Sequence, residues 1–517
     1  MSKEMLKVAH DLFLTTSVCY WVQYNKIIVE GRRFDLLSHP YQAEILDNTA
    51  RVSVFCKGAQ IGFTTVALLQ TLHGLIYGRY PAGVLYLFPT DRDVSDFSRV
   101  RLAAFVKQNE CLADVIRDTD SVELKAIGRS VLYLRGARSR SRLKSIPVDR
   151  IVFDELDEMD PPMVELAKQR VAHSKVKEEV YLSTPTIPDY GIHALYQQSS
   201  QHVWMIKCEA CGGETCLELE FPNCVTEKGD RLCKHCGRKI NWKNGRWVAQ
   251  HPDAEIRGYW ISQLCSDYVS PGVILREFYD PPGGRLNEVY NSRLGMPYID
   301  IKDRLTEQQV FECCGRDPQQ LRWTAPTAMG VDVGNVLHIV IGYAMGDNSY
   351  RILRLHRTTE WNEIHDLAVA FNVNIAVIDM RPEIRKVREL QDQESFPIYG
   401  CVYHSFRLGR PTWDEEKGIV TVGRTEWMDA VHNAIAENML LLPRRDSEVE
   451  LYAKHMSSVC KTYEEDSTGD IRGVYKRVSD DHYYHATGYM MLACQRLPVG
   501  LQPTFVRAKL RPKVNLV

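Results

Sequence analysis

Two pairs of cysteines are the clearest chemical signal in this sequence. Cys208 and Cys211 form one C-x-x-C pair, Cys233 and Cys236 form another, and a glycine follows each pair. Two such knuckles at this separation are typical of a tetrahedral site in which four thiolates hold one zinc ion. A redox role is less well supported, because neither pair opens a helix in a βαβ context. Four thiolates leave no open coordination position, so we expect a structural Zn²⁺.

The segment from residue 52 to residue 65 reads as a strand, a glycine-containing loop and the start of a helix. Such a loop aims backbone N–H groups and a helix N-terminus at a phosphate. The usual phosphate-loop lysine is missing because Phe63 stands in its place, and Lys57 at the loop entrance is the available substitute. An ordinary strand–turn–helix is an equally good interpretation of the loop alone. The candidate ATP contacts here are Lys57, Gly58, Ala59, Gln60, Ile61, Gly62, Phe63, Thr64 and Thr65.

An apolar strand that ends in two carboxylates favours the nucleotide interpretation. Residues 150–153 are followed by Asp154 and Glu155. Asp154 would hold Mg²⁺ through water, together with the Thr64 hydroxyl, and Glu155 would orient the attacking water. The alternative is a strand followed by a solvated acidic turn. An apolar strand with this acidic end, downstream of a glycine-containing loop, predicts a binding site for ATP with Mg²⁺.

Other candidate nucleotide contacts lie outside the loop. Tyr41 and Gln42 would stack on and hydrogen-bond the adenine, although a plain helix N-terminal turn explains them as well. The basic cluster 135–144 would supply an arginine finger or a contact to DNA phosphate, and we name Arg142 as its candidate. The alternative for this cluster is a solvated basic loop.

The segment Ser183, Thr184 and Pro185 follows the next apolar strand. At that position it would sense the γ-phosphate and couple hydrolysis to loops that grip DNA. The alternative is a plain turn at a strand end.

A second group of carboxylates is spread over the C-terminal part of the chain. Asp332 lies on a first strand, Asp379 ends a later one, and Asp480 and Asp481 precede the last helix, which carries His485. Hard cations select oxygen ligands. Two Mg²⁺ or Mn²⁺ ions held about 3.5–4 Å apart would clamp the attacking and leaving oxygens of a phosphodiester. Each aspartate alone is more often a turn or cap residue, but together they indicate an RNase H-like nuclease.

The elements that must position these residues are apolar strands alternating with helices, which predict an α/β fold. We expect a P-loop ATPase domain on a mainly parallel sheet, within residues 1–207. A zinc-ribbon-like module with a linker would span residues 208–325. An RNase H-like nuclease domain would span residues 326–500, followed by a basic tail at residues 501–517.

Composition sets only wide limits. Of the 517 residues, 64 are Lys or Arg and 66 are Asp or Glu, and this balance neither requires nor excludes a local basic surface for DNA. No run of 18 apolar residues occurs and the N-terminus lacks a secretory pattern, so we expect no membrane contact. The 15 cysteines fit a reducing cytoplasm.

Taken together, these motifs resemble the large terminase subunits of tailed bacteriophages, and most of all the lambda-like branch. That branch also has a shifted phosphate-loop lysine, here in residues 57–64, and an acidic Walker B run, here 154–158. It has a Thr-Pro coupling motif, here 183–186, and paired cysteine knuckles after the ATPase. Residues 290–297 look like the family's segment before the nuclease, and residues 330–333 look like its first nuclease strand.

The resemblance covers nearly all of residues 40–495 and implies a DNA-packaging motor. ATP hydrolysis would drive double-stranded DNA through the portal into a procapsid, and the endonuclease would cut concatemeric DNA. The implied partners are a small terminase subunit, the portal and further copies in a ring, within the host cytoplasm and not in the mature virion. Two departures are Phe63 in place of the usual lysine and His485 where many terminases carry a further aspartate.

Three other interpretations remain open at this stage. A helicase-like, DNA-stimulated ATPase with a zinc ribbon would have a second domain without catalysis. An RNase H-like transposase or recombinase would use the first domain as a binding platform and would not need Glu155. A structural capsid-assembly protein would carry both sets of motifs as vestiges.

Overall fold

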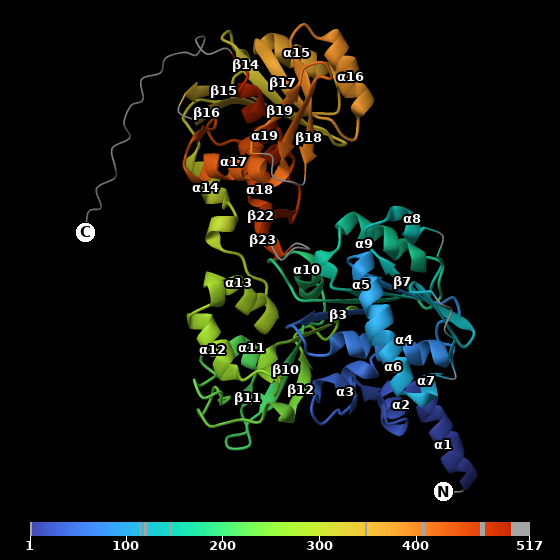
Figure 1. Cartoon of the computed structure of the whole chain (residues 1–517). Helices are drawn as coiled ribbons and strands as arrows, with labels where there is room; N and C mark the ends of the chain where they lie inside the picture. Colours follow the sequence, from blue (N-terminus) through green and yellow to red (C-terminus); the bar gives the residue numbers. More distant parts are fainter. Residues whose placement is uncertain are drawn as a thin grey trace. The chain divides into compact units, whose positions relative to one another are not determined.

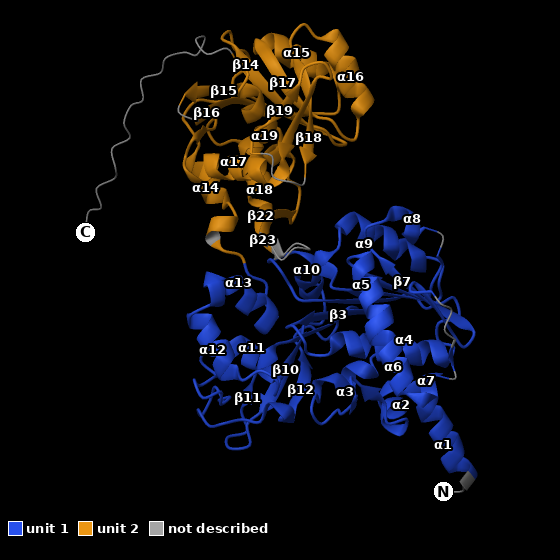
Figure 2. Ribbon diagram, in the orientation of Figure 1, with its two compact units in different colours: residues 1–298 blue, residues 299–517 orange. Residues whose placement is uncertain are grey.

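The chain folds into two compact units, residues 1–298 and residues 299–517 (Figure 2). The expected basic tail, residues 501–517, lies outside the residues that the structure describes. The computed structural model describes residues 3–113, 115–117, 121–144, 146–346, 349–404, 409–465 and 471–497.

Unit 1 is built on a large, mainly parallel sheet (Figure 1). Its central strands pair in parallel from β10 to β7, and antiparallel strands extend both edges. In spatial order the strands are β11 (Glu214–Thr215), β10 (His202–Lys207), β13 (Arg257–Ile261), β3 (Val52–Lys57), β9 (Glu178–Ser183), β8 (Arg150–Asp154), β4 (Val84–Phe88), β7 (Ser130–Gly136), β6 (Leu124–Ile127) and β5 (Ile116–Arg117), with β12 (Gly245–Ala249) beside β10.

Both faces of this sheet are covered, which explains why its strands read as continuous apolar runs. Phe55 of β3 packs into one hydrophobic core, whereas its neighbours Val54 and Cys56 pack into another. No helix among the described residues is both long and apolar enough to cross a membrane. The principal helices of unit 1 are α1 (Lys3–Thr16), α2 (Val18–Tyr24), α3 (Tyr41–Leu46), α4 (Phe63–Ile76), α5 (Asp91–Asp96), α6 (Ala103–Gln108), α9 (Pro161–Lys168), α10 (Gly191–Gln197) and α12 (Pro271–Tyr279).

The cysteine-containing segment is part of unit 1. Strand β10 leads directly into Cys208, and β11, β12 and β13 all belong to the large sheet. The expected segment 208–325 is therefore divided, because residues up to Tyr298 fold with unit 1 and the rest fold with unit 2. The physical reason is that β13 inserts between β10 and β3, which makes the segment part of the large sheet.

Unit 2 is built on a second sheet, in which parallel and antiparallel strands are mixed. The central strand β14 has antiparallel β15 on one side and parallel β17 on the other. A hairpin of β22 (Val459–Glu465) and β23 (Ile471–Arg477) lies outside this sheet. In spatial order the sheet strands are β19 (Thr412–Asp414), β20 (Ile419–Gly423), β18 (Ile398–His404), β17 (Val373–Asp379), β14 (Thr327–Asp332), β15 (Leu337–Gly346), β16 (Ser349–Thr358) and β21 (Leu440–Leu441).

The last helix of unit 2, α19 (His482–Cys494), packs against β14, β15 and β17. The approach is closest at Gly330 of β14, where an added Cβ would lie 2.1 Å from the Ala486 carbonyl oxygen and 2.2 Å from the Met490 nitrogen. Only glycine leaves room for this backbone contact. The other principal helices are α14 (Glu307–Glu312), α15 (Asn362–Ala370), α16 (Ile384–Gln393), α17 (Arg424–Ala436) and α18 (Ser447–Ser457).

Gly330→Ala should therefore destabilise unit 2, because strand and helix must separate to admit the methyl group. We expect the free energy of unfolding, measured by urea denaturation, to fall by about 1–3 kcal/mol. Gly334→Ala is the matched control, since its Cβ would meet neighbours only at ordinary contact distance, 3.6 Å. Equal stability of the two variants would contradict the close approach of β14 and α19.

Candidate nucleotide, zinc and nuclease sites

The candidate nucleotide loop connects β3 to α4. Lys57 is the last residue of β3 and is buried, and Gly62 caps α4 with a left-handed backbone, φ 86°. A residue with a side chain would be strained at this φ, so the glycine permits the tight turn into the helix. The helix N-terminus therefore opens directly onto the loop, as a phosphate site requires.

Thr64 and Asp154 meet beside this loop. The Thr64 hydroxyl donates to Asp154 Oδ1 at 3.2 Å, and the Tyr86 hydroxyl donates to Asp154 Oδ2 at 2.8 Å. Burial, and then the neighbouring charge of Glu155, raise the pKa of Asp154 to about 6. A hydroxyl and a buried carboxylate at this separation form the oxygen ligand set that Mg²⁺ prefers. The sequence predicted Thr64 and Asp154, whereas Tyr86, within an apolar strand, gave no signal.

Glu155 is held next to Lys57. Lys57 Nζ lies 2.7 Å from Glu155 Oε1, so the two catalytic candidates form an ion pair in this structure. Glu155 has a left-handed backbone conformation, φ 60° and ψ 57°, which is rare for a residue with a side chain. Such strain is concentrated at functional sites, where it positions a reacting group.

The candidate coupling segment contacts the same carboxylate. The Thr184 N–H donates to Glu155 Oε2 at 3.3 Å, and the Ser183 hydroxyl donates to it at 3.4 Å. Pro185 follows, and its carbonyl accepts a hydrogen bond from the Asn291 side chain. The end of β9 is thus in direct contact with the residue that would orient the attacking water.

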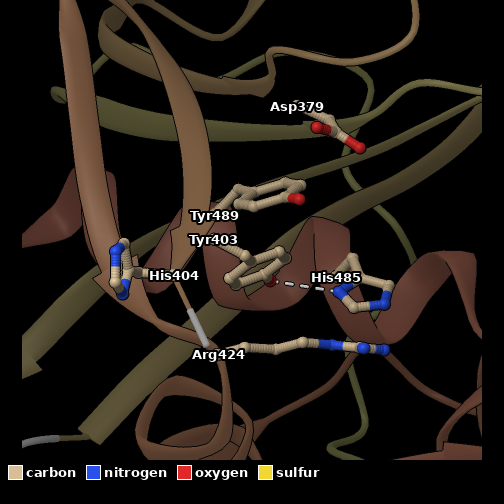
Figure 3. A pocket seen from close by; sticks show the side chains of 6 residues that line it. All are labelled: Asp379, Tyr403, His404, Arg424, His485 and Tyr489. Carbon is tan, nitrogen blue, oxygen red and sulfur yellow. Dashed lines mark hydrogen bonds between the residues drawn. The ribbon is translucent and has the colours of Figure 1, made fainter. Parts of the chain in front are cut away.

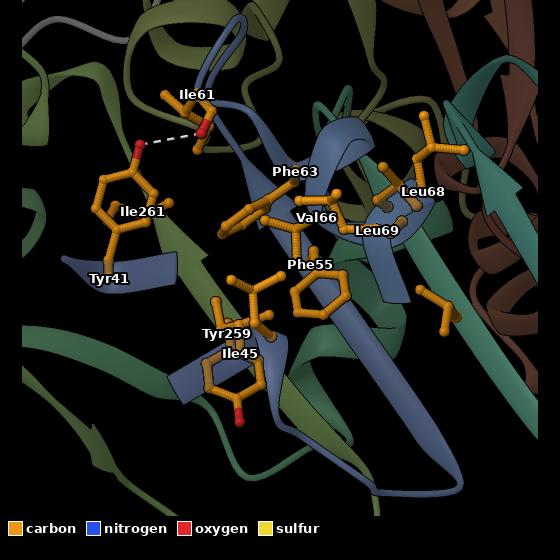
Figure 4. Close-up of a cluster of buried hydrophobic side chains, with 14 of the residues drawn as sticks. Tyr41, Ile45, Phe55, Ile61, Phe63, Val66, Leu68, Leu69, Tyr259 and Ile261 are labelled. Carbon is orange, nitrogen blue, oxygen red and sulfur yellow. Dashed lines mark hydrogen bonds between the residues drawn. The ribbon is translucent and has the colours of Figure 1, made fainter. Parts of the chain in front are cut away.

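Tyr41 and Phe63 are placed differently from the expectation that they contact ATP. Both are buried in a hydrophobic core, where their rings lie 6.1 Å apart at a steep angle (Figure 4). The Tyr41 hydroxyl donates to the Ile61 carbonyl at 3.0 Å, and the Gln42 side-chain amide donates to the same oxygen at 3.1 Å. Tyr41 and Gln42 thus hold the loop at the Ile61 carbonyl. Because the Tyr41 ring is buried, it presents no face on which adenine would stack.

A segment far along the chain closes over the loop. The Gly58 N–H donates to the Ile261 carbonyl at 2.9 Å, and the Ala59 N–H donates to the Ser292 carbonyl at 2.7 Å. The Gln263 side chain donates to the Ala59 carbonyl. Sequence reasoning singled out residues 290–297 only through the family resemblance, and their contact with the loop is a finding of the structure.

The remaining loop-side candidates are placed as follows. Gln60 is exposed with a left-handed backbone, and Thr65 accepts a hydrogen bond at 3.0 Å from Arg101, which the sequence did not single out. Arg142 forms ion pairs with Asp91 and Glu123 at 2.8 and 2.9 Å. In this conformation Arg142 is therefore held by carboxylates of its own unit.

The four cysteines converge as the knuckle pattern predicts. The Sγ atoms of Cys208 and Cys236 lie 3.8 Å apart, those of Cys211 and Cys233 lie 3.7 Å apart, and all four lie within 4.8 Å of one another. Zinc–sulfur bonds of about 2.3 Å give sulfur–sulfur distances of about 3.8 Å in a tetrahedron. The cluster therefore fits one zinc ion.

The carboxylates of unit 2 gather at one end of its sheet. Asp332 ends β14 and Asp379 ends β17, and these strands are parallel neighbours. Burial, opposed by a hydrogen bond from the Arg381 N–H and reinforced by the charge of Asp332, raises the pKa of Asp379 to about 6. Carboxylates that oppose each other's ionisation in this way are suited to a cation.

The helix residues divide into a buried and an exposed set. Asp481 is buried and lies 3.3 Å from His485 Nε2, whereas Asp480 is exposed. Burial alone would raise the pKa of Asp481, but the hydrogen bond and charge of His485 lower it to about 2. Asp481 is thus the ionised neighbour of His485. The ligand atoms of Asp332, Asp379 and Asp481 do not all lie within 4.8 Å of one another.

A pocket opens beside Asp379 (Figure 3). In the close-up, the Tyr403 hydroxyl and His485 Nδ1 are hydrogen-bonded at 3.0 Å, and Arg424 extends toward the same imidazole. Sequence reasoning missed Arg424, which begins α17 and lines the same pocket as Asp379. The lining residues are Asp379, Tyr403, His404, Arg424, His485 and Tyr489.

Comparison with known proteins finds one family that is similar to most of unit 1. Residues 31–260 match the family described as phage terminase large subunit gpA, ATPase domain. Residues 31–260 are therefore similar to the ATPase domain of phage large terminases, and the resemblance found in the sequence is confirmed for this segment. No curated protein matches the chain.

Solved structures extend the likeness in fold to both units. The crystal structure of the HK97 bacteriophage large terminase is similar with a TM-score of 0.54 and 9% identity, over 92% of this chain and 99% of that chain. The large terminase of a thermophilic bacteriophage, in complex with ADP, matches with a TM-score of 0.31 and 12% identity over 86% and 94%. The large terminase nuclease from thermophilic phage G20c matches with a TM-score of 0.24 and 10% identity over 35% and 96%.

The zinc assignment makes a direct prediction. Metal analysis of protein purified without chelator should find one zinc per chain, and Cys211→Ser should lose it together with part of the stability, because the metal contributes folding energy. Cys216→Ser is the matched control, since Cys216 lies in the same segment but outside the four-thiol cluster. Absence of zinc from the unmodified chain, or its retention in Cys211→Ser, would remove the assignment.

Proposed function

We propose that this protein is the large terminase subunit of a tailed bacteriophage, with an ATPase in unit 1 and a metal-dependent DNA endonuclease in unit 2. The observation that carries the proposal is the convergence of Lys57, Thr64, Asp154 and Glu155 at one phosphate loop. The family matched by residues 31–260 supports the ATPase half. The lambda-like branch remains part of the proposal.

In the ATPase, Lys57 releases Glu155 and binds the β- and γ-phosphates. Thr64 and Asp154 would hold Mg²⁺, which would supply positive charge beside the transferred phosphate. Glu155, freed from the lysine, accepts a hydrogen bond from the attacking water and orients it. Backbone N–H groups from Gly58 onward hold the phosphates once their present carbonyl partners give way.

Coupling to movement follows from the contact between Glu155 and the end of β9. A shift of Glu155 toward water breaks its hydrogen bonds with Ser183 and Thr184. The Asn291 side chain donates to the Pro185 carbonyl, so a movement of Pro185 would also move Asn291 and its neighbour Ser292, which contacts the loop. ATP hydrolysis would in this way reposition elements that hold double-stranded DNA.

In the nuclease, Asp332 and Asp379 would hold divalent cations, with Asp481, just before α19, and His485, on α19, as the further ligands. Mg²⁺ or Mn²⁺ at this centre would activate water and stabilise the leaving oxygen. Arg424 binds a phosphate of the DNA strand beside the centre. Asp480, which is exposed, is the weaker ligand candidate.

The wider role is proposed from the resemblance to large terminases. The motor would assemble as a ring on the portal of a procapsid, receive concatemeric DNA with a small terminase subunit, and cut it at initiation and termination. The host cytoplasm is the site where this takes place. The helicase-like and transposase alternatives each retain one of the two activities, so the same experiment separates them.

The test measures DNA-stimulated ATP hydrolysis and plasmid cleavage in Mg²⁺ or Mn²⁺ on the same preparations. Glu155→Gln should lower ATP turnover by at least about 100-fold, because the water is no longer oriented, while nucleotide binding and cleavage persist. Asp332→Ala should abolish cleavage and leave ATP turnover close to normal. Glu165→Gln and Asp366→Ala are matched controls with exposed carboxylates.

Each failure has a distinct meaning. Wild-type turnover in Glu155→Gln would overturn the ATPase assignment. Wild-type cutting in Asp332→Ala would favour a helicase-like ATPase with a second domain that does not cut. Cleavage by the unmodified protein without any ATP hydrolysis would favour the transposase or recombinase alternative.

A further inference from the structure

Two histidines beside Asp332 have no part in the proposed nuclease centre. His338 lies on β15 directly opposite Asp332 in the antiparallel register, and His482 is the first residue of α19. Each of the three side chains offers one ligand atom, and these atoms all lie within 4.8 Å of one another. Three elements that are distant in sequence thus present one carboxylate and two imidazoles to a single small volume.

His338 is buried with an unused ligand atom. Its side chain is only 5% exposed, and its Nδ1 atom has no hydrogen-bond partner. A buried polar atom without a partner is unfavourable and calls for a specific explanation. A cation bound at this nitrogen would provide one, because neutral imidazole is a metal ligand.

His482 is held in place by the carboxylate. Its Nδ1 lies 2.8 Å from Asp332 Oδ2, and its ring stacks on His338 with centroids 4.6 Å apart and an interplanar angle of 14°. The contact between His482 and Asp332 brings together a nitrogen and an oxygen atom that could both bind one cation.

We propose that Asp332, His338 and His482 bind one divalent transition-metal ion of the Mn²⁺ or Fe²⁺ class. Two imidazoles and one carboxylate suit such ions, whereas Mg²⁺ prefers an all-oxygen set. The site shares Asp332 with the proposed nuclease centre and otherwise uses different residues. A metal here would fix the Asp332 carboxylate, and the nuclease would distinguish Mn²⁺ from Mg²⁺ through it.

The third histidine of this region provides a matched control. His455 is buried, and its ring centroid lies 5.3 Å from that of His338 and 5.8 Å from that of His482. Its Nδ1 accepts a hydrogen bond from the Tyr483 N–H at 3.3 Å. It shares the surroundings of the other two imidazoles but lies outside the ligand group.

The experiment titrates the full-length protein, with zinc in its cysteine cluster, with Mn²⁺ alone. Electron paramagnetic resonance counts free Mn²⁺, and its pulsed form detects coupling to directly bound imidazole nitrogen. We expect this coupling in the wild type, in H455Q and in D379N, which removes the carboxylate of the neighbouring centre. H338Q and H482Q should each lower the affinity of the nitrogen-bound ion at least about tenfold.

The readout is metal binding, so it stands apart from cleavage. A protein that binds Mn²⁺ through His338 and His482 but never cuts DNA would sink the nuclease proposal and leave this one intact. Absence of nitrogen coupling in the wild type would overturn this one, as would coupling that only H485Q removes, or equal damage from H455Q. If H338Q does not fold, H482Q provides the test. The His482 side chain is 29% exposed, so we expect this substitution to leave the fold intact.

Discussion

In a parallel sheet, the carboxyl ends of all strands meet at one edge, and both candidate sites of this protein depend on that constraint. In unit 1, β9 lies between β3 and β8. Lys57 and Ser183 end β3 and β9, and Glu155 follows the end of β8. Glu155 contacts both of the other side chains, although the three residues are far apart in sequence. In unit 2, the neighbouring parallel strands β14 and β17 end in Asp332 and Asp379 in the same way.

The electrostatics of each edge explain why it would bind a cation or a phosphate. Asp154 is buried next to Glu155, and Asp379 next to Asp332, so that in each pair burial and a neighbouring negative charge raise one pKa to about 6. Cations relieve such repulsion. Lys57 already relieves it in part at the first site. The fold thus holds charges close together that would separate in an unfolded chain.

Much of the fold was predictable because buried parallel strands are continuous apolar runs, as β4 and β8 are. The sequence also predicted the meeting of Thr64 and Asp154 and of the four cysteines, since motif spacing carries that information. The burial of Tyr41 was not predictable, because an aromatic residue at a helix start serves a ligand or a core equally well. The contact of Ser292 with the loop and the pairing of His338 with Asp332 depend on tertiary packing and strand register, which local pattern does not encode.

The central claim is that Lys57, at the end of β3, takes the place of the missing loop lysine. A structure of the protein with a non-hydrolysable ATP analogue and Mg²⁺ measures this most directly. The account predicts that Lys57 Nζ leaves Glu155 and lies about 2.7–2.9 Å from an oxygen of the β- or γ-phosphate, with Thr64 and Asp154 at the metal. A bound nucleotide with Lys57 still paired to Glu155 and another cation on its phosphates would contradict it.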